Sequence, residues 1–143
     1  MNAVPVTILL IEDDPGHATL IQKNVRRAGV SNEITHVADG TSAIAHLFEA
    51  GEASKADPRL VLLDLNLPDM SGIDILARIK ADPVLKRTPV IVLTTTDDKL
   101  EIQRCYDLGC NVYITKPVEY EGFASAIRQL GLFLTVMQVP EPA

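Results

Sequence analysis

Acidic side chains stand directly after two apolar stretches of the sequence. Glu12, Asp13 and Asp14 follow the stretch Thr7–Ile11. Asp64 follows Leu60–Leu63. If both stretches are strands of one doubly wound sheet, their carboxyl ends share an edge and these carboxylates meet in one crevice. Clustered carboxylates repel one another unless a cation holds them, and an oxygen-only, partly hydrated site suits Mg2+. The spacing therefore predicts a magnesium site suited to phosphoryl chemistry.

Two donor groups stand at equivalent places. Thr94 ends the apolar stretch Val90–Leu93, and Lys116 comes shortly after Val112–Ile114. A phosphoryl group that carries negative charge needs such hydroxyl and ammonium donors. Taken singly, Thr94 is also explained as a helix cap and Lys116 as an exposed surface lysine. Groups at four separate strand ends favour a common site over these separate explanations.

The segments that would position these residues alternate between strand and helix. The strands are continuous apolar stretches, which is the pattern of strands buried on both faces. Helical patterns lie between them, three of them ending at a glycine. The expected helices are Pro15–Ala28, Thr41–Ala50, a helix with the stripe Ile73, Leu76 and Ile79, Asp98–Leu108, and a last helix from about Tyr120. The alternation predicts an α/β, flavodoxin-like doubly wound (βα)5 fold with a five-stranded parallel sheet in the order 2-1-3-4-5.

The composition narrows the class of protein. The chain has 143 residues, 47% of them hydrophobic, so we expect one domain over 1–143, with a core at about 7–130 and a helix extension and tail at 131–143. A net charge of -6 without a basic run argues against nucleic acid. No membrane-spanning or leader pattern is present, so we expect a cytoplasmic protein. Cys105 and Cys110 are expected to be buried thiols, and Gly51–Arg59 to be an extended surface loop.

Four segments resemble response-regulator receiver domains in their order and spacing. They are ILLIEDD, LVLLDLNLPDMSG, PVIVLTTT and YITKP, and the similarity covers roughly Thr7 to Leu130. The resemblance implies that Asp64 is a phosphoacceptor that takes its phosphoryl group from a histidine kinase. It also implies that Mg2+ is bound by Asp13, by Asp64 and by the backbone carbonyl of Asn66. Glu12, where the family more often has Asp, would reach the metal through water.

The same resemblance assigns roles to further residues. Thr94 is similar to the hydroxyl residue that turns inward on phosphorylation, and Lys116 to the lysine that contacts the acyl phosphate. Tyr113 matches the aromatic switch residue, although an ordinary edge-strand aromatic explains it too. Asn66 and Thr96 resemble the variable positions that tune hydrolysis of the phosphoryl group.

A narrower resemblance points to small regulators that are paired with phytochrome-type histidine kinases. The segments EDDPGH and LFLTVMQVP and the long loop before the third strand carry it. The subfamily often has Asp where this chain has His17, so His17 either lies near the acidic pocket or is a half-exposed helix residue. Asp14, before Pro15, fits a helix N-cap as well as a site residue.

The output is expected to be contact with another protein. We predict a homodimer through the fourth helix, the fifth strand and the last helix, with Leu132, Phe133 and Val136 in the interface, and kinase docking on the first helix. The alternative is that the tail folds back over its own sheet. The downstream protein is unknown. An alternative function is a receiver-like adaptor that binds partners without phosphorylation, whereas an FMN protein is disfavoured because acids follow the first strand.

Overall fold

The computed structural model describes residues 3–4, 6–27, 29–116 and 139–140. Its centre is a five-stranded parallel sheet in the order β3-β2-β4-β5-β6. These strands are β2 (Thr7–Ile11), β3 (Ile34–Val37), β4 (Arg59–Leu63), β5 (Val90–Thr94) and β6 (Val112–Thr115). Counted without β1, this is the predicted flavodoxin-like order 2-1-3-4-5, so the fold prediction is confirmed.

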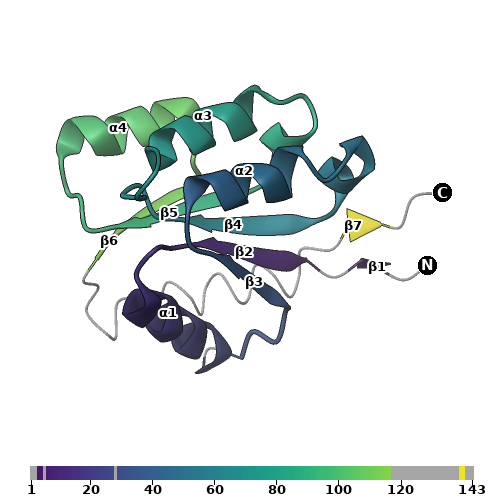
Figure 1. Cartoon of the computed structure of the whole chain (residues 1–143), viewed down its shortest axis with the longest axis horizontal. Helices are drawn as coiled ribbons and strands as arrows, with labels where there is room; N and C mark the ends of the chain where they lie inside the picture. Colours follow the sequence, from purple (N-terminus) through teal and green to yellow (C-terminus); the bar gives the residue numbers. More distant parts are fainter. Residues whose placement is uncertain (1–2, 5, 28, 117–138, 141–143) are drawn as a thin grey trace.

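Helices cover both faces of the sheet (Figure 1). α2, α3 and α4 lie together on one face, and α1 lies on the other. Their bounds are α1 (Pro15–Arg27), α2 (Gly40–Phe48), α3 (Gly72–Ala81) and α4 (Lys99–Leu108), with 3-10 helices at η1 (Glu52–Ala56) and η2 (Leu85–Arg87). The predicted helices are thus found within one to two residues. The last helix, predicted from Tyr120, lies outside the described residues.

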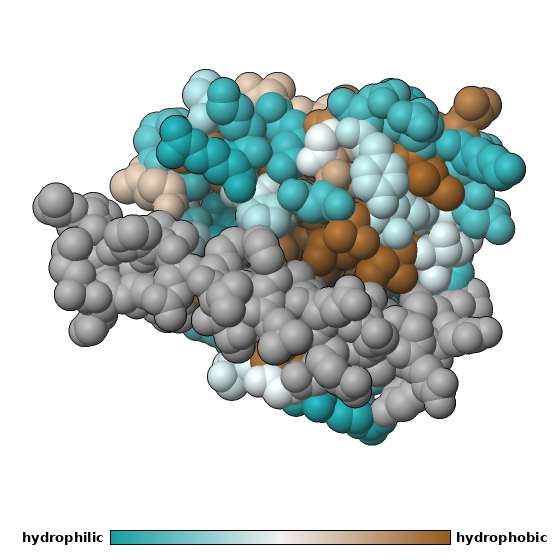
Figure 2. Space-filling view, turned by 180° about the vertical axis from the view of Figure 1, so that it is seen from behind, coloured by the Kyte–Doolittle hydropathy of each residue, from teal (hydrophilic) through white to brown (hydrophobic). Residues whose placement is uncertain are grey.

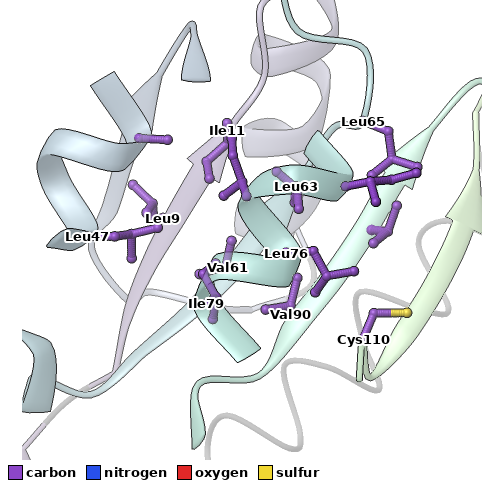
Figure 3. Close-up of a cluster of buried hydrophobic side chains, with 14 of the residues drawn as sticks. Leu9, Ile11, Leu47, Val61, Leu63, Leu65, Leu76, Ile79, Val90 and Cys110 are labelled. Atoms are coloured by element: carbon purple, nitrogen blue, oxygen red, sulfur yellow. The ribbon is translucent and has the colours of Figure 1, made fainter. Parts of the chain in front are cut away.

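The sheet separates two hydrophobic cores. Every residue of β4 and β5 is buried, as their continuous apolar sequences predict. Figure 3 shows one core, in which Leu9, Val61 and Leu63 of the sheet meet Leu47 of α2 and Leu76 of α3. The other core lies against α1. Cys105 and Cys110 are free and buried in the first core, so the prediction of buried thiols is confirmed.

The segment Gly51–Arg59 differs from the expected extended loop, because residues Glu52–Ala56 form the 3-10 helix η1. Local hydrogen bonds explain the turn: Ser54 donates to the carbonyl of Gly51 from both its backbone nitrogen and its hydroxyl. The prediction of an extended conformation there was wrong. Short polar side chains that bond to nearby backbone often produce such compact turns.

A second, two-stranded sheet joins the two ends of the chain. β1 (Ala3–Val4) pairs antiparallel with β7 (Val139–Pro140). Part of the tail therefore returns to the N-terminal segment, beside the main sheet rather than as a sixth strand of it. The predicted interface residues Leu132, Phe133 and Val136 lie outside the described residues, so the prediction that they pair two copies stays a prediction.

One face of the molecule shows both hydrophilic and hydrophobic described residues. Seen from behind, teal residues cover much of it, and brown residues gather near the centre of that face (Figure 2). Within the described ranges, no helix combines the length and hydropathy that are needed to span a bilayer.

Candidate functional site

Four strands, β2, β4, β5 and β6, end at the same edge of the sheet. The parallel register pairs Ile11 with Leu63, so Glu12 and Asp64 leave β2 and β4 side by side. β5 and β6 end as a similar pair, Thr94 beside Thr115. Backbone hydrogen bonds extend both pairings by one step, since Asp64 N donates to Ile11 O and Lys116 N donates to Thr94 O. The predicted residues from distant parts of the sequence therefore meet at this edge.

Three carboxylates form a cluster that fits a metal ion. Glu12, Asp13 and Asp64 each offer an oxygen, and these three atoms all lie within 4.8 Å of one another. Glu12 and Asp64 are 1% and 6% exposed, whereas Asp13 is exposed. An all-oxygen set with one open side suits a hard divalent cation that keeps some of its water. The predicted acidic pocket is therefore present, while the contact predicted for the carbonyl of Asn66 stays a prediction.

Lys116 lies within this cluster and is only 8% exposed. Its ammonium group forms ion pairs with Glu12 and, at 3.4 Å, with Asp64 Oδ2. The alternative of an exposed surface lysine was therefore wrong. A buried cation between two carboxylates reduces their mutual repulsion, which a metal-free site needs.

The electrostatics of the site are dominated by burial. The pKa of Glu12 is raised to about 7: burial is the largest cause, the neighbouring Asp64 carboxyl adds to it, and Lys116 opposes both. Without a bound cation Glu12 therefore exchanges a proton near neutral pH. A divalent cation would replace that proton and favour the ionised carboxylate.

Thr94 and Asn66 stand on the other side of Asp64. Asn66 donates from its backbone nitrogen to Asp64 Oδ1 at 3.0 Å and from Nδ2 to Thr94 Oγ1 at 3.1 Å. Thr94 is fully buried. The next helix, α4, is capped by Asp98, so the alternative of Thr94 as its cap was wrong. The hydroxyl of Thr94 accepts a hydrogen bond here, which leaves its own proton available to a ligand.

Tyr113 is half-buried against the core beside α4. Its hydroxyl donates to the carbonyl of Thr96 at 2.6 Å, and its backbone nitrogen donates to Tyr106 Oη at 3.1 Å. Burial raises the pKa of the Tyr113 hydroxyl, so it remains a donor. This position of Tyr113 fits both interpretations, the aromatic switch residue and an ordinary edge-strand aromatic. The switch movement, and the hydrolysis-tuning roles of Asn66 and Thr96, stay predictions.

His17 satisfies both of its interpretations. It is a half-exposed residue of α1, and its Nδ1 lies 3.3 Å from Lys116 Nζ. Asp14 caps the same helix, since its Oδ1 accepts a hydrogen bond from His17 N at 3.0 Å. His17 therefore borders the acidic pocket through the lysine rather than through a carboxylate.

Two contacts at this edge were missed by sequence reasoning. His36 Nε2 lies 2.7 Å from the backbone oxygen of Glu12. Asp69 binds the start of α2, where it accepts hydrogen bonds from Gly40 N and Thr41 N at 2.8 Å and from the Thr41 hydroxyl. Asp69 belongs to the segment DLNLPDMSG, from which sequence reasoning took only Asp64 and Asn66 as site residues. The histidine carried no spacing signal, because its partner is a backbone atom 24 residues away.

Comparisons with known proteins agree with this fold and site. The model of the response regulator receiver domain family matches residues 8–128, and the chain belongs to this family of signalling domains. A response regulator receiver domain from Rhodospirillum rubrum is 65% identical, with a TM-score of 0.83 over 95% of this chain and 98% of that one. The response regulator Rcp1 of Synechocystis sp. is 41% identical over 78% of this chain and 77% of its own length.

Two solved structures inform the site. The Mn2+-bound form of Rcp1 has a TM-score of 0.79 at 35% identity and covers 95% of this chain and 99% of that one. The phosphorylated cyanobacterial phytochrome response regulator RcpA has a TM-score of 0.81 at 38% identity and covers 96% of this chain and all of that one. One similar family member is thus known with a divalent metal bound, and in this chain Glu12, Asp13 and Asp64 form a cluster that could hold such an ion.

Proposed function

We propose that Asp64 accepts a phosphoryl group from a sensor histidine kinase and that the chain acts as a phosphorylation switch. The observation that supports this most directly is the placement of the buried Asp64 carboxylate. It lies within the acidic cluster, 3.4 Å from Lys116 Nζ, and shares Asn66 as a hydrogen-bond partner with Thr94. An adaptor that only binds partners has no need of this arrangement.

The site residues have different roles in the proposed phosphoryl transfer to Asp64. Asn66 N holds Asp64 Oδ1 and Lys116 holds Oδ2, so the carboxylate is oriented before the donor arrives. An Asp64 oxygen attacks the phosphorus of a phosphohistidine in line, the phosphorus–nitrogen bond breaks, and the imidazole leaves. Lys116 and the Thr94 hydroxyl then donate to the phosphoryl oxygens. Hydrolysis of the aspartyl phosphate resets the switch.

We propose Mg2+ as the natural metal. Asp13, Asp64 and the carbonyl of Asn66 would hold it, with Glu12 reaching it through water, and when bound it would neutralise charge on the phosphoryl oxygens. The donor set supports this proposal because every side-chain ligand is a carboxylate oxygen, without histidine or thiolate.

We propose that the kinase is of the phytochrome type, because RcpA is described as a phytochrome response regulator and similar chains as bacteriophytochrome response regulators. The kinase would dock on α1, where Leu20 is 54% exposed and His17 borders the acidic pocket. We further propose that residues 1–143 form a single cytoplasmic receiver and that its output is contact with a downstream protein.

Self-association is a separate proposal. Leu100 on α4 is 82% exposed, and Tyr106 of α4 and Val112 of β6 are 45% and 41% exposed. Large apolar side chains gathered on neighbouring elements are typical of an interface. A homodimer through α4, β6 and the last helix would cover them.

Native mass spectrometry with Mg2+ and acetyl phosphate tests both proposals. We expect one phosphoryl adduct per chain, with none in Asp64→Asn. Asp74→Asn is the matched control, because Asp74 is exposed on α3 and does not belong to the carboxylate cluster. The same spectra report monomer and dimer. Absence of an adduct in the wild-type protein would refute phosphorylation and favour the adaptor, and a monomer in both states would refute the dimer.

A further inference from the structure

A pocket of about 250 Å³ lies at the end of the sheet opposite the acidic cluster. It is formed by η1, η2 and the residues that begin β4 and β5, and in Figure 1 β4 begins near the end of the molecule where both termini lie. Arg59 is the first residue of β4, and Asp64 follows the last. At the rise of a strand, five residues separate the two by roughly 16 Å. The pocket is therefore distinct from the phosphoacceptor site.

Arg59 lines this pocket and is unusually deeply placed for an arginine, being only 7% exposed. Its Nη2 donates to the carbonyl of Ser54 at 3.0 Å. Its Nη1 is buried and has no hydrogen-bond partner among the described residues. Buried polar groups are nearly always satisfied, and a charged one is especially costly when left without a partner. The guanidinium group therefore has the capacity for an additional acceptor.

The charges around the pocket favour an anion. Lys55 is already matched, because its ammonium group pairs with Glu52 at 3.0 Å and with Asp82 at 2.9 Å. Arg59 and Arg87 also line the pocket, and neither forms a salt bridge in the described part of the chain. Among the described residues, Asp57 is the only acidic one that lines it. Among the described lining residues, two arginines without a salt bridge therefore stand against one carboxylate.

We propose that this pocket binds a small organic monocarboxylate, with Arg59 as the main anion receptor and Arg87 as a second. The planar fork of a guanidinium matches both oxygens of a carboxylate. The apolar walls come from Pro58, Val84 and Pro89, which suits a short hydrocarbon body. The volume equals that of about eight water molecules, so it fits an acid of roughly that many heavy atoms. A nucleotide is too large for it.

The test is a titration of the full-length, ¹⁵N-labelled chain without divalent metal, followed by NMR. The probes are sodium benzoate, benzyl alcohol as the neutral analogue of similar shape, and inorganic phosphate as an anion without an apolar body. We expect saturable benzoate shifts at the amides of Ala56 and Thr88 with a Kd of about 1–10 mM, and at least tenfold weaker binding of the other two probes.

His46 supplies an independent readout. Its pKa is lowered, first by burial and second by the positive charge of Arg59. A carboxylate bound to Arg59 offsets that charge, so benzoate should raise the pKa of His46, and benzyl alcohol should not. Equal binding of benzyl alcohol would show an apolar cavity only and would overturn the proposal, as would the absence of saturable shifts.

Three variants locate the binding. Arg59→Met keeps an apolar stem without the charge and should lose benzoate binding at least tenfold, while Arg87→Gln should weaken it severalfold. Arg104→Gln is the matched control, because Arg104 is exposed on α4. Thermal melting shows whether Arg59→Met folds, and if it does not, Arg87→Gln decides. Unchanged binding in both pocket variants would overturn the proposal. So would loss of binding in Asp64→Asn, because that would place benzoate at the phosphoacceptor site.

Discussion

Gly72 lies where α3 packs on the end of β4, and we predict that this position does not tolerate even an alanine. A Cβ on Gly72 would lie 2.4 Å from the backbone oxygen of Asp64 and 2.7 Å from the Cα of Leu65. Carbon atoms in good contact lie about 3.5–4.0 Å apart, so α3 or the phosphoacceptor backbone must move by about 1 Å. The backbone cannot rotate away as a side chain can, and the hydrogen bond from Gly72 N to Leu65 O ties the two segments together.

The loss of stability expected for Gly72→Ala follows from this overlap. Overpacking of a rigid contact costs about 3 kcal/mol, and the better helix propensity of alanine returns up to about 1 kcal/mol. We therefore expect Gly72→Ala to lower the free energy of unfolding by about 2–3 kcal/mol and the Tm by roughly 6–12 °C. Because Asp64 must shift, the rate of phosphorylation by acetyl phosphate should fall at least tenfold.

Gly40→Ala is the matched control, since Gly40 also begins a helix. The three atoms nearest to its Cβ would all belong to the side chain of Met70, which is half-exposed and can rotate away. We expect this variant to lie within about 1 kcal/mol of the wild-type protein. Urea denaturation followed by circular dichroism measures both variants. Equal stabilities of the two would refute the reasoning, because they would show that the end of β4 yields as easily as a methionine side chain.

Three further predictions concern ionisable groups. The pKa of Glu12 is 4.5 in the unfolded chain and about 7 in the folded protein, so Glu12 stabilises the fold most at low pH, and this stabilisation is lost as the pH rises between these values. Without metal, the free energy of unfolding of the wild-type protein should fall by up to about 3 kcal/mol from pH 4.5 to 7 relative to that of Glu12→Gln. Mg2+ should reverse the loss. If urea denaturation showed the same difference in free energy of unfolding between the two proteins at every pH, that would contradict this. The hydroxyl of Thr41 and two backbone N–H groups lower the pKa of Asp69 to about 2, so Asp69→Asn should melt below the wild-type protein at neutral pH, with the gap closing as the pH falls from 3.8 through 2. A gap that does not change with pH would argue against the charge. Burial raises the pKa of Cys110 to about 11, so a thiol reagent at pH 8 should modify it only after urea unfolds the chain; modification of the native protein at the rate of free cysteine would contradict the buried position.

The sequence alone was sufficient for the sheet and for the residues at its edge. β4 and β5 are buried on both faces, so their sequences are continuous apolar stretches that can be recognised without knowledge of the fold. A parallel sheet delivers all its strand ends to one edge, so Glu12, Asp64 and Lys116 could be grouped before any coordinates. The receiver segments then assigned roles to them.

The tertiary structure decided the contacts between groups that are distant in sequence. Lys116 reaches Glu12 across 104 residues and His17 across 99, and Asp69 binds the start of α2 across 29. Arg59 begins an apolar strand, and no local pattern shows that one of its guanidinium nitrogens is buried without a partner. Periodicity encodes whether a side chain is buried, because burial repeats with the geometry of the element. Which atom it meets there depends on how helices and loops pack on the sheet, and that packing is a property of the whole fold.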